Sequence, residues 1–387
     1  MDFGKHKETR HLKPLQVPNK EKLLLDVSNI EDSFTGRADA SVANTFIFEA
    51  SHLIVNSLAL FEQGYFDCAF YSLRQSLEVA MTMMYLFDSE EVVRKRELEK
   101  WRGEQHFPMY AGMAKYLESN ESQFKDIKNK LSEFFEEAEK VKKRLNKYVH
   151  KQGFDKFYAS RNHALTRIKG KFDDEAFTNE FIEYVESCIG TVAVMRLAID
   201  PMPVLLNDEE IYARTVDTMT YPYSDKFINK YIGVDAIEKY KLTSMYSQHY
   251  DCFMQEEKQN EAVSWIFKDK FIDIKRADEI LAQGHLLSQV ELLGVIALQN
   301  IESVTKFYTC GGFIMYFSNR DTLRQKLEWN TRQFDNFLAT KPSSNQPFDE
   351  VFISTFNLPE GEIFLEHNHP ITGNDIYNIE HLIRSFK

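Results

Sequence analysis

The chain has 387 residues, of which 43% are apolar and 13% aromatic. That is enough to build large cores, and the length exceeds the usual size of one domain. Its 15 glycines and 10 prolines are few for this length, which excludes a collagen-like, Gly/Pro-rich or intrinsically disordered chain. We therefore expect a folded, helix-rich protein of two domains.

The cysteines and the N-terminus indicate the compartment. Four cysteines (Cys68, Cys188, Cys252 and Cys310) lie far apart and show no C-x-x-C spacing, which favours reduced, buried thiols over a disulfide framework. The N-terminal residues lack the apolar segment of a signal peptide, and no apolar run reaches the roughly 18 residues of a membrane span. The sequence predicts a soluble cytoplasmic protein that makes no membrane contact.

The first 40 residues are mixed and polar, and we expect them to form an arm. From Val42 the apolar residues recur at three- and four-residue steps, which predicts a helix that ends at Gln63-Gly64. A second helix begins near Tyr65, and its apolar residues spread around most of the circumference, so it should be central. These residues are Ala69, Leu73, Leu77, Ala80, Met84 and Phe87.

Further helices are expected up to residue 200. The segments are a charged link over 90–102, a short helix after Pro108, a long helix from about Glu121 to Lys151, a basic loop over 153–171, and a helix from about Asp174 to Ile199. The run Asp200-Pro-Met-Pro203 has two prolines in three residues, which predicts a domain boundary there.

The second half repeats the helical pattern at about 224–256, 261–283, 287–307 and 321–339. Residues 351–356 and 362–366 then alternate like a small hairpin around Pro359, and a short amphipathic helix begins near Asn374. The predicted fold class is all-α. The predicted divisions are an arm over 1–40, a helical bundle over 41–200, a helical sensor or partner domain over 201–348, and a C-terminal hairpin and helix over 349–387.

The charge is unevenly distributed. The net charge of −12 argues by itself against nucleic-acid binding, but residues 140–171 contain eleven Lys/Arg and one acid. The same segment contains Tyr148, Phe154, Phe157 and Tyr158. Basic groups hold phosphates and aromatic faces stack on unpaired bases, so the segment predicts contact with a polyanion. The alternative is an ordinary solvated surface.

One motif in this segment points to a family. In Lys142-Lys-Arg-Leu-Asn-Lys-Tyr-Val-His150-Lys, five residues separate Arg144 from His150 near the end of the long helix. Together with the helix Gly64-Tyr-Phe-Asp-Cys-Ala-Phe-Tyr-Ser-Leu-Arg-Gln-Ser-Leu-Glu78, it resembles the HEPN superfamily over about residues 41–200. The string Leu-Asn-Lys-Tyr-Val-His-Lys is similar to that of HEPN-like proteins found in bacterial defence and toxin loci.

The resemblance implies a helical bundle that dimerises and brings two R-x(4–6)-H motifs together across a shared groove. Active members are endoribonucleases that need no metal or other cofactor. By this resemblance His150 would transfer a proton at the ribose 2′-hydroxyl or the leaving oxygen, and Arg144 would hold the scissile phosphate. An imidazole exchanges protons near neutral pH, and a guanidinium forks onto phosphate oxygens. The plausible RNA contacts are Lys143, Asn146, Lys147, Lys151 and Arg161.

The motif departs from the family pattern in two ways. Leu145 follows the arginine where active members often have a polar residue, and Asn146 comes one position later. On a straight helix the six-residue offset places Arg144 about 120° from His150. Lys143 could then take the cationic role, or the helix could unwind toward Gly153 so that Arg144 and His150 converge. In the plainest interpretation His150 only caps the helix C-terminus.

Weaker signals lie elsewhere. Arg74 and Glu78 fit an intrahelical ion pair, although Arg74 could also reach the groove of His150. His163 lies in the basic loop and is expected to be an exposed loop histidine. Glu366-His-Asn-His369 has the spacing of two metal ligands on a strand, but no partner ligand is apparent nearby, and a hairpin end explains it equally well. No phosphate-binding loop or nucleophile elbow is present.

Together these features predict a homodimeric, RNA-cleaving toxin or anti-phage defence effector, restrained by its second domain or by a regulatory, antitoxin-like partner. The alternative is a non-catalytic HEPN-like module that dimerises or docks a partner protein in a defence or regulatory complex. The two hypotheses differ in whether His150 faces a groove and in whether binding weakens steeply with salt.

Overall fold

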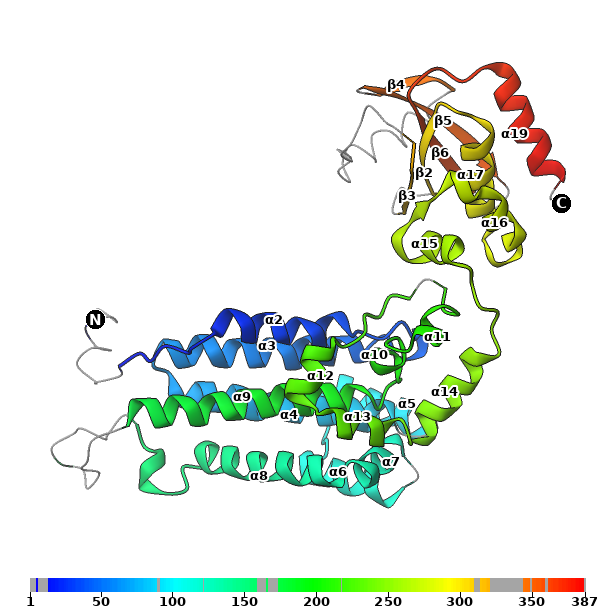
Figure 1. Cartoon of the computed structure of the whole chain (residues 1–387). Helices are drawn as coiled ribbons and strands as arrows, with labels where there is room; N and C mark the ends of the chain where they lie inside the picture. Colours follow the sequence, from blue (N-terminus) through cyan, green and yellow to red (C-terminus); the bar gives the residue numbers. More distant parts are fainter. Residues whose placement is uncertain are drawn as a thin grey trace. The chain divides into compact units, whose positions relative to one another are not determined.

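A computed structural model describes Lys5, residues 13–88, 91–120, 122–158, Leu165, and residues 173–216, 218–309, 314–320, 344–348, 350–358 and 361–385. The chain divides into two compact units, shown in Figure 1. Unit 1 comprises residues 1–212 and 218–255, and unit 2 comprises residues 213–217 and 256–387.

Every regular element among the described residues of unit 1 is a helix. Its helices up to residue 196 are α2 (Lys20–Asp32), α3 (Ala43–Glu62), α4 (Phe66–Phe87), α5 (Glu91–Arg102), α6 (Tyr110–Ser119), α7 (Gln123–Lys130), α8 (Ser132–Val149) and α9 (Asp174–Arg196). Those that follow are α10 (Met202–Leu205), α11 (Glu209–Tyr212), α12 (Asp225–Tyr231), α13 (Val234–Tyr240) and α14 (Ser244–Met254).

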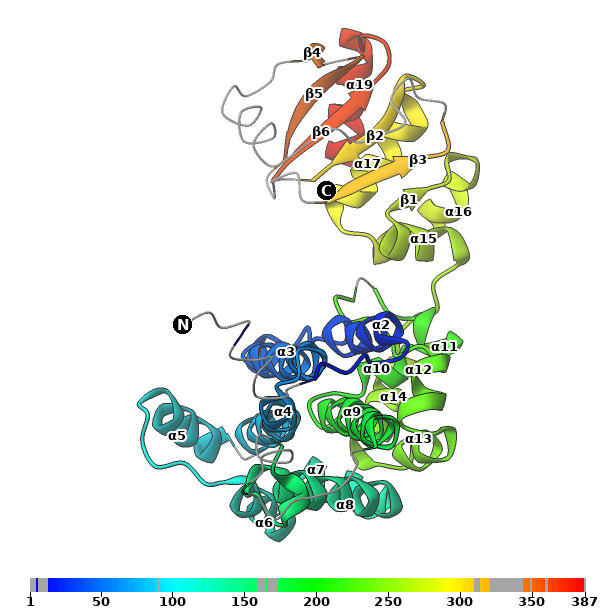
Figure 2. The same cartoon turned by 90° about the vertical axis from the view of Figure 1, so that its left-hand side faces the viewer.

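Helix α4 is the centre of unit 1, as its apolar circumference predicts. It contacts α3, α6, α8 and α9, and Figure 2 shows it end-on among them. All six apolar residues named for this helix in the sequence are buried. The turn before it was also predicted correctly, because α3 ends at Glu62 and Gly64 takes a φ of 79°. Glycine reaches this left-handed conformation without a steric cost.

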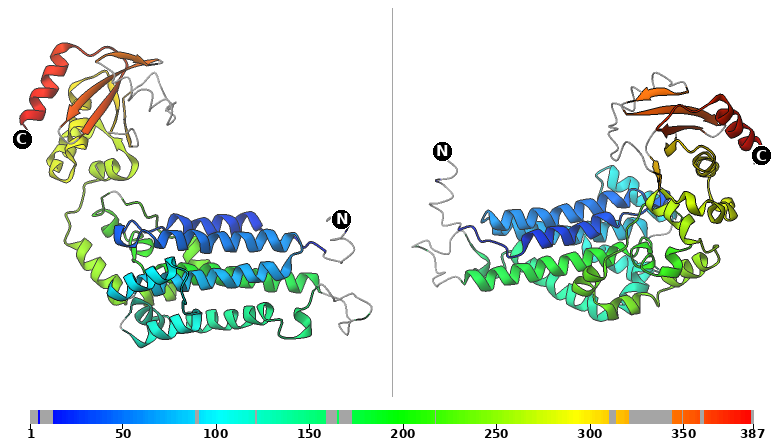
Figure 3. Two further views of the ribbon diagram at one scale, coloured as in Figure 1. Left: turned by 180° about the vertical axis from the view of Figure 1, so that it is seen from behind. Right: turned by 45° about the horizontal axis from the view of Figure 1, so that its top comes forward.

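The first 40 residues are more than an arm. Helix α2 lies beside α3 in both views of Figure 3 and buries Leu23, Val27 and Ile30 in the core of unit 1. These three residues have helical spacing, but charged and polar residues surround them in the sequence.

The long helix expected over 121–151 is two helices, because the backbone breaks at buried Leu131. No glycine or proline marks this break.

Unit 1 extends to residue 255, so the predicted boundary at Asp200-Pro201 lies inside it. The chain after Asp200 folds back onto α9. The Tyr223 hydroxyl donates to the carbonyl oxygen of Ala193 at 3.1 Å, and the Tyr240 hydroxyl donates to that of Leu197 at 2.9 Å. The two prolines mark a turn between packed helices, and α12 to α14 belong to the same core.

Unit 2 contains a six-stranded sheet, whereas the sequence predicted a mostly helical second domain with only a small C-terminal hairpin. Its strands are β1 (Phe271–Ile272), β2 (Val304–Tyr308), β3 (Met315–Ser318), β4 (Gln346–Phe348), β5 (Val351–Leu358) and β6 (Gly361–His367), in the order β1-β3-β2-β6-β5-β4. Its helices are α15 (Glu261–Asp269), α16 (Ala277–Ala282), α17 (Gln289–Asn300) and α19 (Gly373–Ser385).

The C-terminal hairpin is confirmed, since β5 and β6 pair antiparallel. A helix was expected over 287–307. Its first part is confirmed as α17, which ends at Asn300, and its last part is wrong, because β2 follows there. All five residues of β2 are buried, so this strand lacks the alternation that marks a half-buried strand in a sequence. The helix expected over 321–339 lies outside the described residues. Among the residues described, no helix is long and apolar enough to cross a membrane.

Gly190 lies where α9 packs closely against the end of α12, and this close packing predicts an effect on stability. A Cβ atom at this position would lie 2.1 Å from the carbonyl oxygen of Tyr231. Gly190→Ala should therefore lower the free energy of unfolding of unit 1 by about 2–3 kcal/mol, because two helix backbones must separate. Urea unfolding followed by circular dichroism measures this loss.

Gly36→Ala is the matched control, because its nearest neighbour would be the Cβ atom of Met219 at 4.0 Å. We expect this variant to unfold within about 0.5 kcal/mol of wild type. Equal stability of the Gly190→Ala variant and wild type would contradict the close packing of α9 against α12.

Candidate functional site

Helix α8 carries the motif, and its apolar face fixes how the motif is presented. Val141, Leu145 and Tyr148 are buried against the bundle. The Tyr148 ring stacks on Phe70 of α4 with a centroid distance of 3.9 Å and an interplanar angle of 12°. The Tyr148 hydroxyl donates to Glu180 of α9 at 2.9 Å. These contacts hold α8 in one rotation about its own axis.

Within one chain Arg144 and His150 point to different sides of α8. The Arg144 guanidinium lies 3.4 Å from the Glu183 carboxylate on α9, and its side chain is half exposed. His150 is the C-cap residue, is exposed, and its backbone N–H still donates to the Asn146 carbonyl at 2.8 Å. The helix is therefore regular up to His150, and the six-residue offset is retained. The left-handed turn at Lys151 and Gly153 comes too late to bring the two side chains together.

A different set of residues shares a face with His150. Lys143 and Lys147 are exposed, and helical geometry places them within about 60° of His150 around the axis. Neither lysine forms an ion pair with any residue that the structure describes. Lys143, Lys147 and His150 are named the outer line of α8 below. Lys143 was the lysine that the sequence offered as an alternative cation, and Lys147 lies on the same side of the helix.

Most other described basic side chains of the segment face a carboxylate. The pairs are Lys140 with Glu137, Lys142 with Glu139, Arg144 with Glu183, Lys151 with Asp67, and Lys156 with Asp155. The positive field of this segment is therefore weaker than its sequence suggests. Lys151, expected to contact RNA, also donates to the carbonyl oxygen of Lys156 at 3.1 Å. Arg161 and His163 lie outside the described residues.

Asn146 faces inward and joins α8 to α4. Its side-chain oxygen accepts from Arg74 Nε at 2.7 Å, and Arg74 Nη1 lies 2.6 Å from a Glu78 oxygen. The other Glu78 oxygen accepts from the backbone N–H of Tyr110 at 2.8 Å. Arg74 thus makes the expected intrahelical pair and also reaches α8. Asn146, predicted as an RNA contact, is committed to a half-buried network.

Two residues that the sequence did not single out complete this network. Lys142 is buried, and its ammonium lies 3.8 Å from the centre of the Tyr110 ring. Loss of water around Lys142 lowers its pKa, and burial raises the pKa of Tyr110. Lys142 looked like one more member of the basic run, and Tyr110 stood in no motif. Only the packing of α6 and α8 against α4 brings them together.

The aromatic residues of the basic segment separate into two groups. Tyr148 is buried, and Tyr158 stacks on it at 6.4 Å. Phe154 is 70% exposed and Phe157 is 39% exposed, with their ring centroids 6.3 Å apart. Tyr158 is half-buried, so Phe154 and Phe157 are the most exposed of the four aromatic residues named in the sequence.

The His-x-His motif of unit 2 is used for hydrogen bonds. His367 Nε2 lies 2.9 Å from the Ser354 hydroxyl oxygen, and its Nδ1 lies 2.8 Å from the His369 carbonyl oxygen. The neighbouring Glu366 accepts from Lys306 at 3.1 Å and from Tyr308 at 2.9 Å. Within the described ranges, no group of three or more His, Cys, Asp or Glu side chains could hold a metal ion.

Comparison with protein-family models, with curated proteins and with solved structures finds no match to the chain. The candidate site is therefore defined by geometry alone. Its two parts are the exposed outer line of α8 and the inward network of Arg74, Glu78 and Asn146.

The inward network predicts a measurable coupling. Asn146→Ala should lower the free energy of unfolding by about 1–2 kcal/mol, because Arg74 Nε loses its acceptor in a half-buried place. Arg74→Met removes the same contact. The double variant should therefore lose less stability than the sum of the losses of the two single variants, by at least about 0.5 kcal/mol in the free energy of unfolding. Urea unfolding of the four proteins measures this coupling.

Lys147→Ala is the control on the outer side of the same helix, and we expect it to change the stability by less than about 0.5 kcal/mol. Strict additivity of Asn146→Ala and Arg74→Met would mean that the contact contributes nothing in solution.

His367 predicts a pH dependence in unit 2. Burial lowers the pKa of His367 below its ordinary value of about 6.5. The unfolded chain therefore binds this proton more readily, and the stability of unit 2 should fall as the pH drops below about 6.5. His367→Gln should remove this component. Hydrogen exchange of the amides in residues 351–367, corrected for intrinsic rates, tests it between pH 7.5 and 5.5. The same acid-induced loss of protection in both proteins would contradict the assignment.

Proposed function

We propose that unit 1 is a metal-independent, RNA-cleaving domain of the HEPN type that acts as a homodimer in the cytoplasm. One observation carries the proposal. The outer line of α8 combines an exposed imidazole with two exposed lysines that have no acidic partner among the described residues. A phosphodiester backbone lying along this line would meet two cations and one proton-transfer group.

The chemistry follows from these groups. In metal-independent cleavage the ribose 2′-oxygen attacks the adjacent phosphorus, a cyclic phosphate forms, and the 5′-oxygen leaves. Neutral His150 would accept the proton of the 2′-hydroxyl, and the imidazolium would return a proton to the leaving oxygen. Lys147, three residues before His150, would stabilise the charge that develops on the phosphoryl oxygens.

Arg144 has a different role in this proposal from the one that the family resemblance implies. In its own chain the guanidinium is turned toward Glu183 on α9 and away from His150. It reaches a scissile phosphate only if a second chain places its own His150 near it. Loss of activity on substitution of Arg144 would therefore indicate a composite dimer groove. Loss of activity on substitution of Lys147 would indicate catalysis by the residues of one chain.

The second candidate is the non-catalytic interaction module. The ion pairs of Arg144, Lys151 and Lys156 favour it, because they reduce the positive charge available to RNA. In this alternative α8 and its neighbours bind a second copy or a regulatory protein. Under the enzymatic proposal, a toxin or anti-phage effector needs such a regulatory partner to restrain it.

An RNA-cleavage assay with EDTA present separates these functions. Wild-type protein should cleave single-stranded RNA, and His150→Ala should slow cleavage by at least about 100-fold. Lys147→Ala should slow it by about 10-fold or more, since it removes one phosphate contact. Arg144→Ala should have a comparable effect only if the groove is shared by two chains. Circular dichroism and light scattering must show an unchanged fold and oligomeric state.

Lys22→Ala, which removes an exposed lysine from α2, is the control and should cleave at the wild-type rate. RNA affinity should fall steeply as salt rises from 50 to 200 mM. Absence of cleavage together with absence of growth inhibition on expression would reject the enzyme and favour the interaction module. Growth inhibition that disappears with His150→Ala would support the enzyme.

A further inference from the structure

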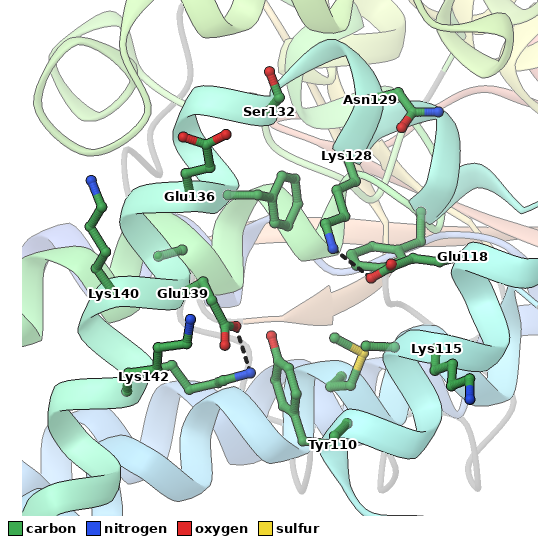
Figure 4. A pocket seen from close by; sticks show the side chains of 17 residues that line it. Tyr110, Lys115, Glu118, Lys128, Asn129, Ser132, Glu136, Glu139, Lys140 and Lys142 are labelled. Carbon is green, nitrogen blue, oxygen red and sulfur yellow. Dashed lines mark hydrogen bonds and ion pairs between the residues drawn. The ribbon is translucent and has the colours of Figure 1, made fainter.

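A pocket of about 670 Å³ opens between α6, α7 and α8, with α4 at its base. Figure 4 shows it from close by, with Lys142 and Glu139 on the α8 side and Lys128 and Glu118 on the opposite side. Pockets of roughly 300–1,000 Å³ are typical for small organic ligands. This pocket lies on the inner side of α8, and of the outer line only Lys143 also lines it.

The pocket has an apolar floor. The residues that form it are Met81, Ala111, Ala114, Phe124, Phe135 and Ala138. Phe124 and Phe135 meet edge to face at 5.6 Å, so the floor is well packed. A ligand held here would cover apolar surface, and transfer of its apolar part from water would favour binding.

The charged residues of the lining are predominantly basic. Five lysines line the pocket together with three glutamates. Lys142 lies deepest, paired with Glu139 at 2.6 Å and placed over the Tyr110 ring at 3.8 Å. Its ammonium has three donors, and the Glu139 contact uses one of them. Such a partly desolvated cation in a pocket is characteristic of a binding site.

Two further groups complete the arrangement. Lys128 of α7 pairs with Glu118 of α6 on the wall opposite Lys142, so cations approach the pocket from two sides. The Tyr110 hydroxyl points into the pocket and has no hydrogen-bond partner among the described residues. An anionic ligand in the pocket would meet Lys142 and the Tyr110 hydroxyl on one side and Lys128 on the other.

We propose that this pocket binds a small organic anion with an apolar body, its charged group held by Lys142, Lys128 and Tyr110 and its body lying on Ala111, Ala114 and Ala138, above the buried Met81, Phe124 and Phe135. An inorganic anion would leave the floor uncovered. A neutral apolar molecule would leave unused the donors of Lys142 and Lys128 that their ion pairs with Glu139 and Glu118 do not occupy. The site does not depend on RNA cleavage, because neither His150 nor Lys147 contributes to it.

The test uses the full-length chain and the dye 8-anilinonaphthalene-1-sulfonate, a planar apolar anion. The dye should bind at one site per chain with enhanced, blue-shifted fluorescence. Lys142→Met and Lys128→Met keep the apolar stems and remove the charges, so each should weaken dye binding by at least about 10-fold. Ala114→Trp, or Ala111→Trp as a second filling variant, should abolish it.

Three controls make the outcome decisive. Lys147→Met changes an unpaired lysine outside the pocket and should bind the dye as wild type does. The neutral analogue N-phenyl-1-naphthylamine should bind the Lys142→Met variant and wild type equally. Sodium sulfate should compete only at concentrations at least about 100-fold above those of the dye.

Several results would overturn the proposal. The first is that the wild type binds no dye, or that the dye still binds after both the lysine substitutions and the pocket-filling substitutions. The second is that Lys142→Met weakens binding of the neutral analogue as much as it weakens binding of the dye. The third is that sulfate competes with the dye at similar concentrations. Circular dichroism of each variant must match that of wild type, so that lost binding reports the pocket.

Discussion

Helix α4 is apolar around most of its circumference, and its enclosure is the constraint on which unit 1 depends. Each large apolar side chain that it buries contributes roughly 1.5–3 kcal/mol, so most of the helix must be covered, and only a narrow face with Cys68, Tyr71 and Gln75 is exposed. Four helices, α3, α6, α8 and α9, supply the cover. Their rotations follow from this packing, since Leu145 and Tyr148 must face α4. The burial of the hydrophobic face of α8 therefore determines which of its polar side chains face solvent and which face other helices.

Once Leu145 and Tyr148 point inward, the polar residues of α8 lie on three sides. Asn146 and Lys142 meet Arg74 and Tyr110, Arg144 meets Glu183, and the outer line is left in solvent. The outer side of α8 has glutamates in its first half and lysines in its second, which also suits the helix dipole. Among the described residues, the basic run of the sequence is thus divided between ion pairs, a pocket and an exposed surface, and only the lysines of the exposed surface lack an acidic partner.

Unit 2 shows where the pattern of residues is least informative. The hairpin of β5 and β6 was predictable, because its strands alternate and proline and glycine lie between them. Strand β2 was not, because both of its faces are covered and the sequence shows no period of two. Lys306 and Glu366 pair inside this sheet, with side-chain exposures of 3% and 0%. Because of its charged residue Lys306, the buried strand β2 could not be told from a partly exposed helix in the sequence.

The sequence by itself determined that unit 1 is a helical bundle with α4 at its centre, that α3 ends just before Gly64, and that basic residues gather late in α8. Local periodicity and backbone preference are properties of short segments, so they could be deduced without the fold. Only the tertiary structure decided that Arg144 and His150 diverge, that Arg74 reaches Asn146, and that Lys142 lies over Tyr110. Each of these depends on how helices distant in the chain are rotated against one another, and that rotation is set by packing.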